Sequence, residues 1–115
     1  MKKLIIILTA CLFLCGCSQD KNEEMKELMA ENEYIIVDVR TKEEYSRGHI
    51  EESINIPYDE INEDIEISKD ALIFVYCQSG NRSKYAYEIF TNLGYNTYDL
   101  GAYEYIDLPK TDAKK

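Results

Sequence analysis

The sequence predicts an α/β fold, a small doubly wound parallel sheet of four or five strands flanked by helices. Two observations lead to this fold class. Residues 34–37 and 71–75 are short, uninterrupted apolar runs rich in β-branched side chains, which is the pattern of strands buried on both faces of a parallel sheet. Residues 84–93, which follow the second run after a polar loop, place their apolar side chains at helical spacing. Strands that alternate with helices favour parallel pairing through crossover connections.

The first half of the chain supplies three further elements. Residues 23–30 predict a helix with a methionine- and leucine-containing inner face and acidic residues in its first turn. Residues 34–40 predict a strand that ends in charged residues. Thr41 and Glu44 have the spacing of a capping box, so a short helix should run from there through Tyr45.

The second half continues the alternation. Residues 48–50 should form a turn that leads into a short strand within residues 53–57. The acidic segment 59–67 should turn its isoleucines inward and leave its carboxylates in solvent. Gly94 stands where a helix C-cap glycine is expected, and residues 96–100 predict the last strand.

The chain begins with lysines followed by an apolar run, residues 4–14, that is too short to span a bilayer comfortably. A basic start and a short apolar core are typical of a secretory signal peptide. Residues 14–17 resemble a bacterial lipobox, in which cleavage leaves a lipid-modified cysteine at the new N-terminus. Cys17 is the candidate because the small Gly16 precedes it. An uncleaved anchor and ordinary secretion are the alternatives to palmitate-type lipidation of Cys17.

These signals divide the chain into a signal peptide at residues 1–16, a lipidated N-terminus and tether at 17–22, one domain at 23–109 and a polar tail at 110–115. Removing the signal peptide removes two lysines and no acid, so the net charge changes from −9 to −11. Such an acidic chain argues against nucleic acid as a partner and against adsorption to anionic lipid. The lipid should therefore anchor the domain at the outer face of the bacterial cell membrane.

Cleavage also simplifies the cysteine content. Cys11 and Cys15 would leave with the signal peptide and Cys17 would be acylated. Cys77 would then be the one free thiol, and no intrachain disulfide framework could form. An unpaired thiol in an oxidising compartment points to a functional Cys77.

Residues 76–83, Tyr-Cys-Gln-Ser-Gly-Asn-Arg-Ser, form the predicted loop between the strand at 71–75 and the following helix, with Cys77 as the first loop residue. A loop at this place points backbone N–H groups inward, and the helix N-terminus adds partial positive charge. Cys77 is thus the candidate nucleophile. The candidate substrate-binding residues are Gln78, Ser79, Gly80, Asn81, Arg82 and Ser83.

This loop, with Asp-Val-Arg at 38–40, Gly-His-Ile at 48–50 and Asn-Ile-Pro at 55–57, resembles the rhodanese (sulfurtransferase) family over about residues 34–109. The resemblance implies that Cys77 accepts a sulfur atom from a small anionic donor such as thiosulfate and becomes a persulfide. The sulfur then passes to a thiol or cyanide-like acceptor, with no metal or organic cofactor. The closing segment departs from the family pattern: Ala102 replaces a glycine, tryptophan is absent and the run to Pro109 is short.

For three further residues, Asp38, Arg40 and His49, a role in the site competes with a purely structural role. Asp38 and Arg40 end a predicted strand, where ligands of doubly wound sheets bind, so they are possible supporting residues of the site. We favour the alternative, a structural Asp–Arg pair that fixes the loop. His49, the only histidine, is interpreted as structural and not as a metal ligand or base.

Two other functions compete with sulfur transfer. Cysteine phosphatases share the cysteine-to-arginine loop, but theirs is one residue longer than the four residues between Cys77 and Arg82 here. The shorter loop favours the sulfurtransferase. The second alternative is a sulfur carrier or thiol-redox binding module that has the same fold without turnover.

Overall fold

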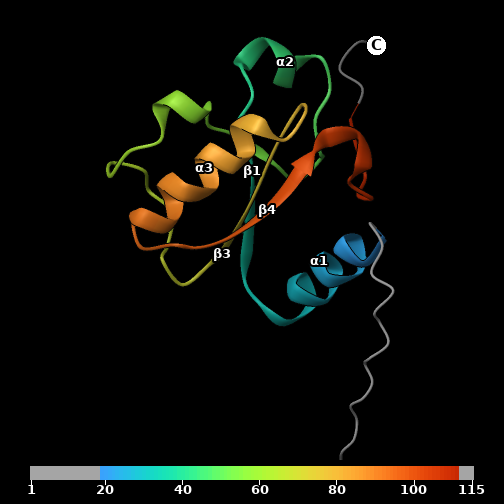
Figure 1. The fold of residues 1–115 in the computed structure, drawn as a ribbon, viewed down its shortest axis with the longest axis horizontal. Helices are drawn as coiled ribbons and strands as arrows, with labels where there is room; N and C mark the ends of the chain where they lie inside the picture. The colour runs from blue at the N-terminus through green and yellow to red at the C-terminus, as the bar shows by residue number, and fades with distance from the viewer. Residues whose placement is uncertain (1–18, 112–115) are drawn as a thin grey trace, which may run out of the picture.

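The computed structural model describes residues 19–111, in which a four-stranded sheet has helices on both faces (Figure 1). The elements along the chain are α1 (Gln19–Glu31), β1 (Tyr34–Asp38), α2 (Lys42–Ser46), β2 (Ile54–Asn55), the 3-10 helix η2 (Tyr58–Glu60), β3 (Leu72–Cys77), α3 (Asn81–Asn92), β4 (Asn96–Ala102) and the 3-10 helix η3 (Tyr103–Tyr105). All strand pairs are parallel, in the order β2-β1-β3-β4. The predicted fold class is confirmed.

The predicted signal peptide, Cys17 and the last four residues of the polar tail lie outside the described residues. Within residues 19–111, none of the helices has the length and apolar content needed to cross a membrane.

Strand β3 lies between β1 and β4 and divides the core in two. Its alternate side chains point to opposite faces, so Ile73, Val75 and Cys77 join one cluster while Phe74 and Tyr76 join the other. The first cluster also contains Val37, Val39, Ile61, Ala86, Phe90 and Tyr95 and is covered by α3. The second contains Met25, Ile36, Ile50, Leu100 and Ile106 and is covered by α1 and the C-terminal segment. Each fully buried Phe contributes about 1.5–3 kcal/mol relative to an exposed one.

The start of α1 differs from the sequence prediction. The helix begins at Gln19, so residues 19–22 of the predicted tether are helical. Two hydrogen bonds of Asn22 explain the extension, because its side chain donates to the Tyr105 carbonyl oxygen (3.0 Å) and accepts from the Asp107 N–H (3.0 Å). These contacts tie the first turn of α1 to the C-terminal segment, which sequence periodicity does not reveal.

Other local predictions agree with the structure, except for the start of α3. The capping box is present, since the Thr41 hydroxyl oxygen accepts from the Glu44 N–H (3.1 Å) and Glu44 accepts from the Thr41 N–H (3.0 Å). Gly94 follows α3 with φ +101°, a left-handed value that favours glycine. Ile61 is buried in the acidic segment. Helix α3 begins three residues before the predicted start, at Asn81, so the Cys77 loop is shorter than expected.

Candidate active site

Cys77 is the last residue of β3, where its strand pairing with Ala102 of β4 continues, and not the first loop residue as predicted. Its side chain has no exposed surface. The sulfur accepts backbone N–H groups from Gly80 (2.9 Å) and Ser83 (3.2 Å). Both donors lie at the N-terminal end of α3, where the helix dipole also favours negative charge. The surroundings of the Cys77 sulfur therefore stabilise an anionic sulfur atom.

Gly80 makes this cradle geometrically feasible. Its φ of +106° is in the left-handed region, which lets the chain turn back so that its N–H faces the sulfur. The Gly80 carbonyl oxygen then accepts from the Ser83 hydroxyl (3.1 Å) and the Lys84 N–H (3.2 Å). The predicted substrate-binding residues Gln78, Ser79 and Asn81 are exposed around this turn, and Ser83 is buried beneath it.

Arg82 lies at the start of α3 and forms a bidentate pair with Glu44, with nitrogen–oxygen distances of 2.9 and 3.1 Å. Hydrogen bonding to Arg82 is the main reason that the pKa of Glu44 falls to about 2. The same bonds raise the pKa of the Arg82 guanidinium, although its burial acts to lower this pKa. Negative charge on Cys77 also acts to raise it. Arg82 is thus electrostatically coupled to the sulfur, and its contact with a donor stays a prediction.

Asp38 and Arg40 form a buried ion pair in which Nη2 of Arg40 lies 2.7 Å from Oδ2 of Asp38. Although burial acts to lower it, the pKa of the Arg40 guanidinium is raised because Asp38 hydrogen-bonds to it and attracts its charge. Arg40 also donates to the Gln78 side-chain oxygen (2.9 Å) and to the Gly48 carbonyl oxygen (2.7 Å). The buried pair is thus placed to hold the loop after β1, as the structural interpretation of the sequence expects. Through Arg40 it connects this loop to the segments that contain Gly48 and Gln78.

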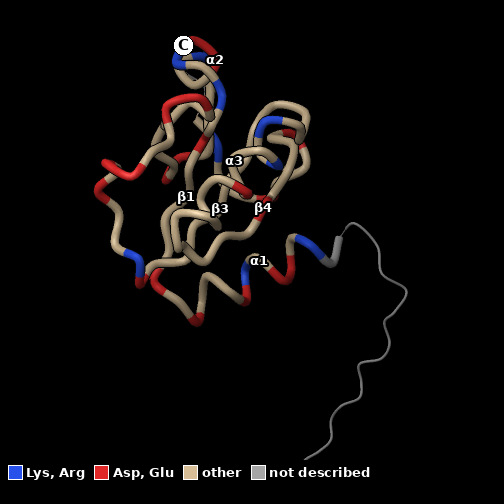
Figure 2. The backbone as a smooth tube through the Cα atoms, turned by 60° about the vertical axis from the view of Figure 1, so that its left-hand side comes forward, with Lys and Arg blue, Asp and Glu red and all other residues tan. Residues whose placement is uncertain are grey.

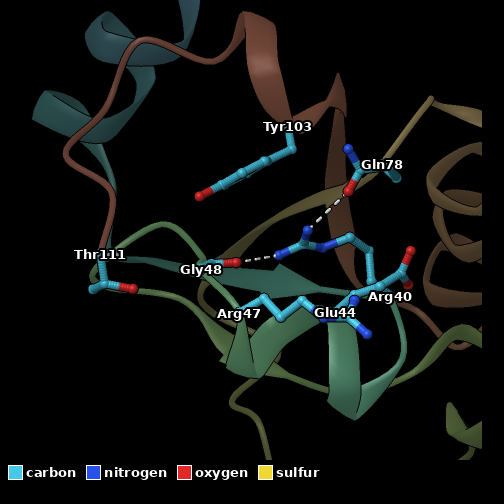
Figure 3. Close-up of a pocket in the computed structure, with 7 residues that line it drawn as sticks. All are labelled: Arg40, Glu44, Arg47, Gly48, Gln78, Tyr103 and Thr111. Atoms are coloured by element: carbon cyan, nitrogen blue, oxygen red, sulfur yellow. Dashed lines mark hydrogen bonds between the residues drawn. The ribbon is translucent and has the colours of Figure 1, made fainter. Parts of the chain in front are cut away.

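A cleft of about 460 Å³ adjoins the Cys77 loop (Figure 3). The residues that line it are Arg40, Glu44, Arg47, Gly48, Gln78, Tyr103 and Thr111. Cys77 is not among them, but its neighbour Gln78 is, and so is Glu44, the partner of Arg82. The Tyr103 ring covers Arg40, whose guanidinium carbon lies 4.5 Å from the ring centroid. We did not identify Arg47, Tyr103 and Thr111 from the sequence as residues of the site. The one signal was the departure from the family pattern at Ala102, which indicated an unusual segment next to Tyr103.

Among the described residues, the hydrogen bonds and ring contacts of His49 are with Tyr45 and Thr111, and none is with Cys77. The His49 ring stacks on Tyr45 with centroids 3.7 Å apart, and its Nδ1 donates to the Tyr45 carbonyl oxygen (2.8 Å). These contacts agree with the structural interpretation. In the part of the chain that the structure describes, no group of three or more His, Cys, Asp or Glu side chains is placed to hold a metal ion.

Residues 21–105 match the family model described as the rhodanese-like domain. The chain belongs to the rhodanese-like family. Among its relatives is the thiosulfate sulfurtransferase PspE of Escherichia coli, 36% identical over 78 residues, which make up 64% of this chain and 75% of the relative. The thiosulfate:glutathione sulfurtransferase of Saccharomyces cerevisiae is 35% identical over 95 residues, with 68% of each chain covered.

Longer relatives match this rhodanese-like chain only in part. The adenylyltransferase and sulfurtransferase uba4 of Ogataea parapolymorpha is 34% identical over 79 residues, which cover 67% of this chain but 20% of that protein. Solved structures agree with the fold. A rhodanese with anions from E. coli has a TM-score of 0.64 at 34% identity, over 69% of this chain and 98% of that chain. A rhodanese-like domain protein from Staphylococcus aureus has a TM-score of 0.61 at 28% identity, over 71% and 82%.

Proposed function

We propose that this rhodanese-like protein is a membrane-anchored, extracytoplasmic sulfurtransferase that moves sulfane sulfur from a donor such as thiosulfate through a Cys77 persulfide. The observation that carries the proposal is the pair of backbone N–H groups of Gly80 and Ser83 on the Cys77 sulfur. The names of the PspE and yeast relatives support thiosulfate as the donor.

The reaction proceeds in two displacements at sulfur. The Cys77 thiolate attacks the outer sulfur of thiosulfate, the sulfur–sulfur bond of the donor breaks, and its electron pair leaves with sulfite. An acceptor thiolate or cyanide then attacks the outer sulfur of the persulfide, and the electron pair returns to Cys77. The two N–H groups stabilise the anionic sulfur before and after each step. Because Cys77 has no exposed surface, each reactant reaches it only after a local movement of the covering atoms.

Intact mass spectrometry of the purified domain tests the persulfide. Incubation with thiosulfate should add the mass of one sulfur atom, and cyanide or dithiothreitol should remove it. Cys77→Ser should gain nothing, whereas Glu43→Gln, a control at an exposed position of α2 outside the loop, should load normally. Loading that is followed by repeated formation of thiocyanate supports an enzyme; loading without turnover would instead indicate a sulfur carrier, and no loading would contradict the proposal.

The anchor is a separate proposal that rests on the sequence pattern of residues 1–17. Because α1 begins at Gln19, two residues after Cys17, an acylated Cys17 would place the domain close to the bilayer at the outer face of the cell membrane. Cys17→Ala should leave the protein unprocessed or released, without lipid. A Cys17→Ala protein that is still processed and still carries lipid would contradict the assignment.

A further inference from the structure

The cleft beside the Cys77 loop is much larger than thiosulfate requires. A five-atom anion occupies roughly the volume of two or three water molecules, about 60–90 Å³. The cleft measures about 460 Å³, which is within the range of about 300–1,000 Å³ that is common for sites of larger organic ligands. The cleft therefore has room for a reactant with an organic chain beside Gln78, the residue that follows Cys77.

Arg47 gives the cleft an uncompensated positive charge. The other charged side chains that line the cleft are neutralised, because Arg40 pairs with Asp38 and Glu44 pairs with Arg82. Arg47 is exposed, and no residue within 19–111 forms an ion pair or side-chain hydrogen bond with its guanidinium. The chain has a net charge of −9, and Figure 2 shows acidic positions recurring along α1 and in the loop at the left of β1. Among the charged residues that line the cleft, Arg47 is thus the one without a described counter-charge, and it can pair with an anionic group.

The cleft also offers a neutral donor, the side-chain amide of Gln78. Because the Gln78 side-chain oxygen accepts from Arg40, its amide nitrogen is left without a partner among the described residues. In Figure 3, Tyr103 and Arg47 lie on opposite sides of the Arg40 guanidinium, and the Gln78 side-chain oxygen points toward that guanidinium. A ligand whose sulfur reaches the loop at Gln78 can thus extend along the cleft and meet Arg47.

We propose that this cleft binds the sulfur acceptor, a low-molecular-weight thiol that carries a carboxylate, and that Arg47 pairs with the carboxylate. The inference rests on the proposed Cys77 persulfide. The acceptor enters as a thiol and releases its proton to solvent, and its thiolate attacks the outer sulfur of the persulfide. The bond between that sulfur and the Cys77 sulfur breaks, Cys77 returns to the thiolate, and the acceptor leaves as a persulfide.

The test separates loading from transfer. Wild type, Arg47→Ala and Arg47→Lys are first loaded with thiosulfate, and loading is followed by intact mass. Transfer is then measured to two small acceptors, 3-mercaptopropionate, which carries a carboxylate, and 2-mercaptoethanol, which is neutral. Lys42→Ala is the matched control, because it removes one positive charge from α2 outside the cleft.

Arg47→Ala should load normally, lose about three- to tenfold in kcat/KM for 3-mercaptopropionate, and change less than about twofold for 2-mercaptoethanol. Arg47→Lys should recover part of the loss, and Lys42→Ala should leave the ratio of the two acceptors unchanged. Equal losses with both acceptors, or slower loading by thiosulfate in Arg47→Ala, would overturn the assignment. Failure of the wild type to load would contradict the proposed function itself.

Discussion

The loops after β1 and β3 begin from neighbouring parallel strands at the same edge of the sheet, yet they are built differently. After β1, a side-chain carboxylate satisfies a buried guanidinium, with Arg40 and Asp38 held by short ion-pair contacts. After β3, the backbone N–H groups of Gly80 and Ser83 donate to the Cys77 sulfur. No side chain among residues 19–111 hydrogen-bonds to this sulfur. At the end of β1, the charge of Arg40 is thus neutralised by Asp38. At the end of β3, the backbone can stabilise a negative charge on the Cys77 sulfur.

The difference shows that the loop after β1 has a structural role, whereas the loop after β3 carries the reactive group. Two contacts join the loops: Arg40 donates to Gln78, and Arg82 pairs with Glu44. Each arginine reaches from one loop to the other, so the neutralised loop fixes the position of the reactive one. Changes to the Asp38–Arg40 pair should therefore act mainly on stability, and changes in the Cys77 cradle should act mainly on sulfur transfer.

The largest expected loss of stability follows removal of the buried carboxylate. Asp38→Ala leaves the Arg40 guanidinium buried without its counter-charge, which should lower the free energy of unfolding by about 3–5 kcal/mol. Urea denaturation measures the loss. The control is Asp107→Ala, which breaks the exposed pair with Lys26 and should have little measurable effect. Equal effects of the two variants would show that the buried pair contributes no more than a surface pair.

A smaller loss should follow strain in the cradle. Gly80→Ala meets no atom within 4 Å, so its cost, about 1–2 kcal/mol, comes from the left-handed backbone alone. Because the Gly80 N–H faces the sulfur, sulfur loading should also slow. Gly94→Ala is the matched control, since its φ of +101° is similar but lies at the far end of α3. It should cost similar stability and load normally; slow loading in both variants would assign the effect to the helix as a whole.

Glu44→Gln should have a modest effect that depends on pH. Glutamine can keep the capping box with Thr41 but loses the ion pair with Arg82, and both partners are partly exposed, so we expect about 0.5–1 kcal/mol at pH 7. Because the pKa of Glu44 is lowered to about 2 in the folded protein, the advantage of the wild type is present above about pH 4.5 and disappears as the pH falls toward 2.

Thermal unfolding of wild type and Glu44→Gln between pH 7 and pH 2 measures this window. Glu43→Gln, the adjacent exposed acid, is the control and should show no such window. An unchanged difference between wild type and Glu44→Gln across the whole range would disprove the contribution of the ion pair.

The smallest expected effect is that of His49→Phe. Phenylalanine keeps the stacking on Tyr45 but loses the hydrogen bond to its carbonyl oxygen, which should cost about 0.5 kcal/mol. Sulfur transfer should stay within about twofold of the wild type. A loss of about a hundredfold or more in kcat/KM would instead be typical of a general base.

Local signals were sufficient to predict much of the fold. The β3–loop–α3 unit, the capping box at Thr41 and Glu44 and the cap at Gly94 each depend on residues close together in the chain, so periodicity and spacing reveal them. The extent of β3 was underestimated because Cys77 keeps its pairing with β4, a contact between distant segments.

The site was predictable where it is local and, for Asp38 and Arg40, where the ends of parallel strands meet at one edge of the sheet. The cysteine and its backbone donors lie within six residues, whereas Arg82 and its partner Glu44 are 38 residues apart. Thr111 reaches the cleft because its N–H donates to the His49 carbonyl oxygen (2.8 Å). These two residues are 62 positions apart, so no local sequence pattern predicts their contact. The chemistry was therefore visible in the sequence, and the cleft that surrounds it was not.

Release of sulfite in the absence of an acceptor tests the central claim, that the cradled Cys77 thiolate displaces sulfite from the donor. With excess thiosulfate and no acceptor, the wild type should release one equivalent of sulfite per protein in a single burst and then stop. Cys77→Ser should release none. A wild-type protein that releases no sulfite, or a Cys77→Ser protein that releases the same equivalent, would contradict the assignment of Cys77 as the sulfur-carrying nucleophile.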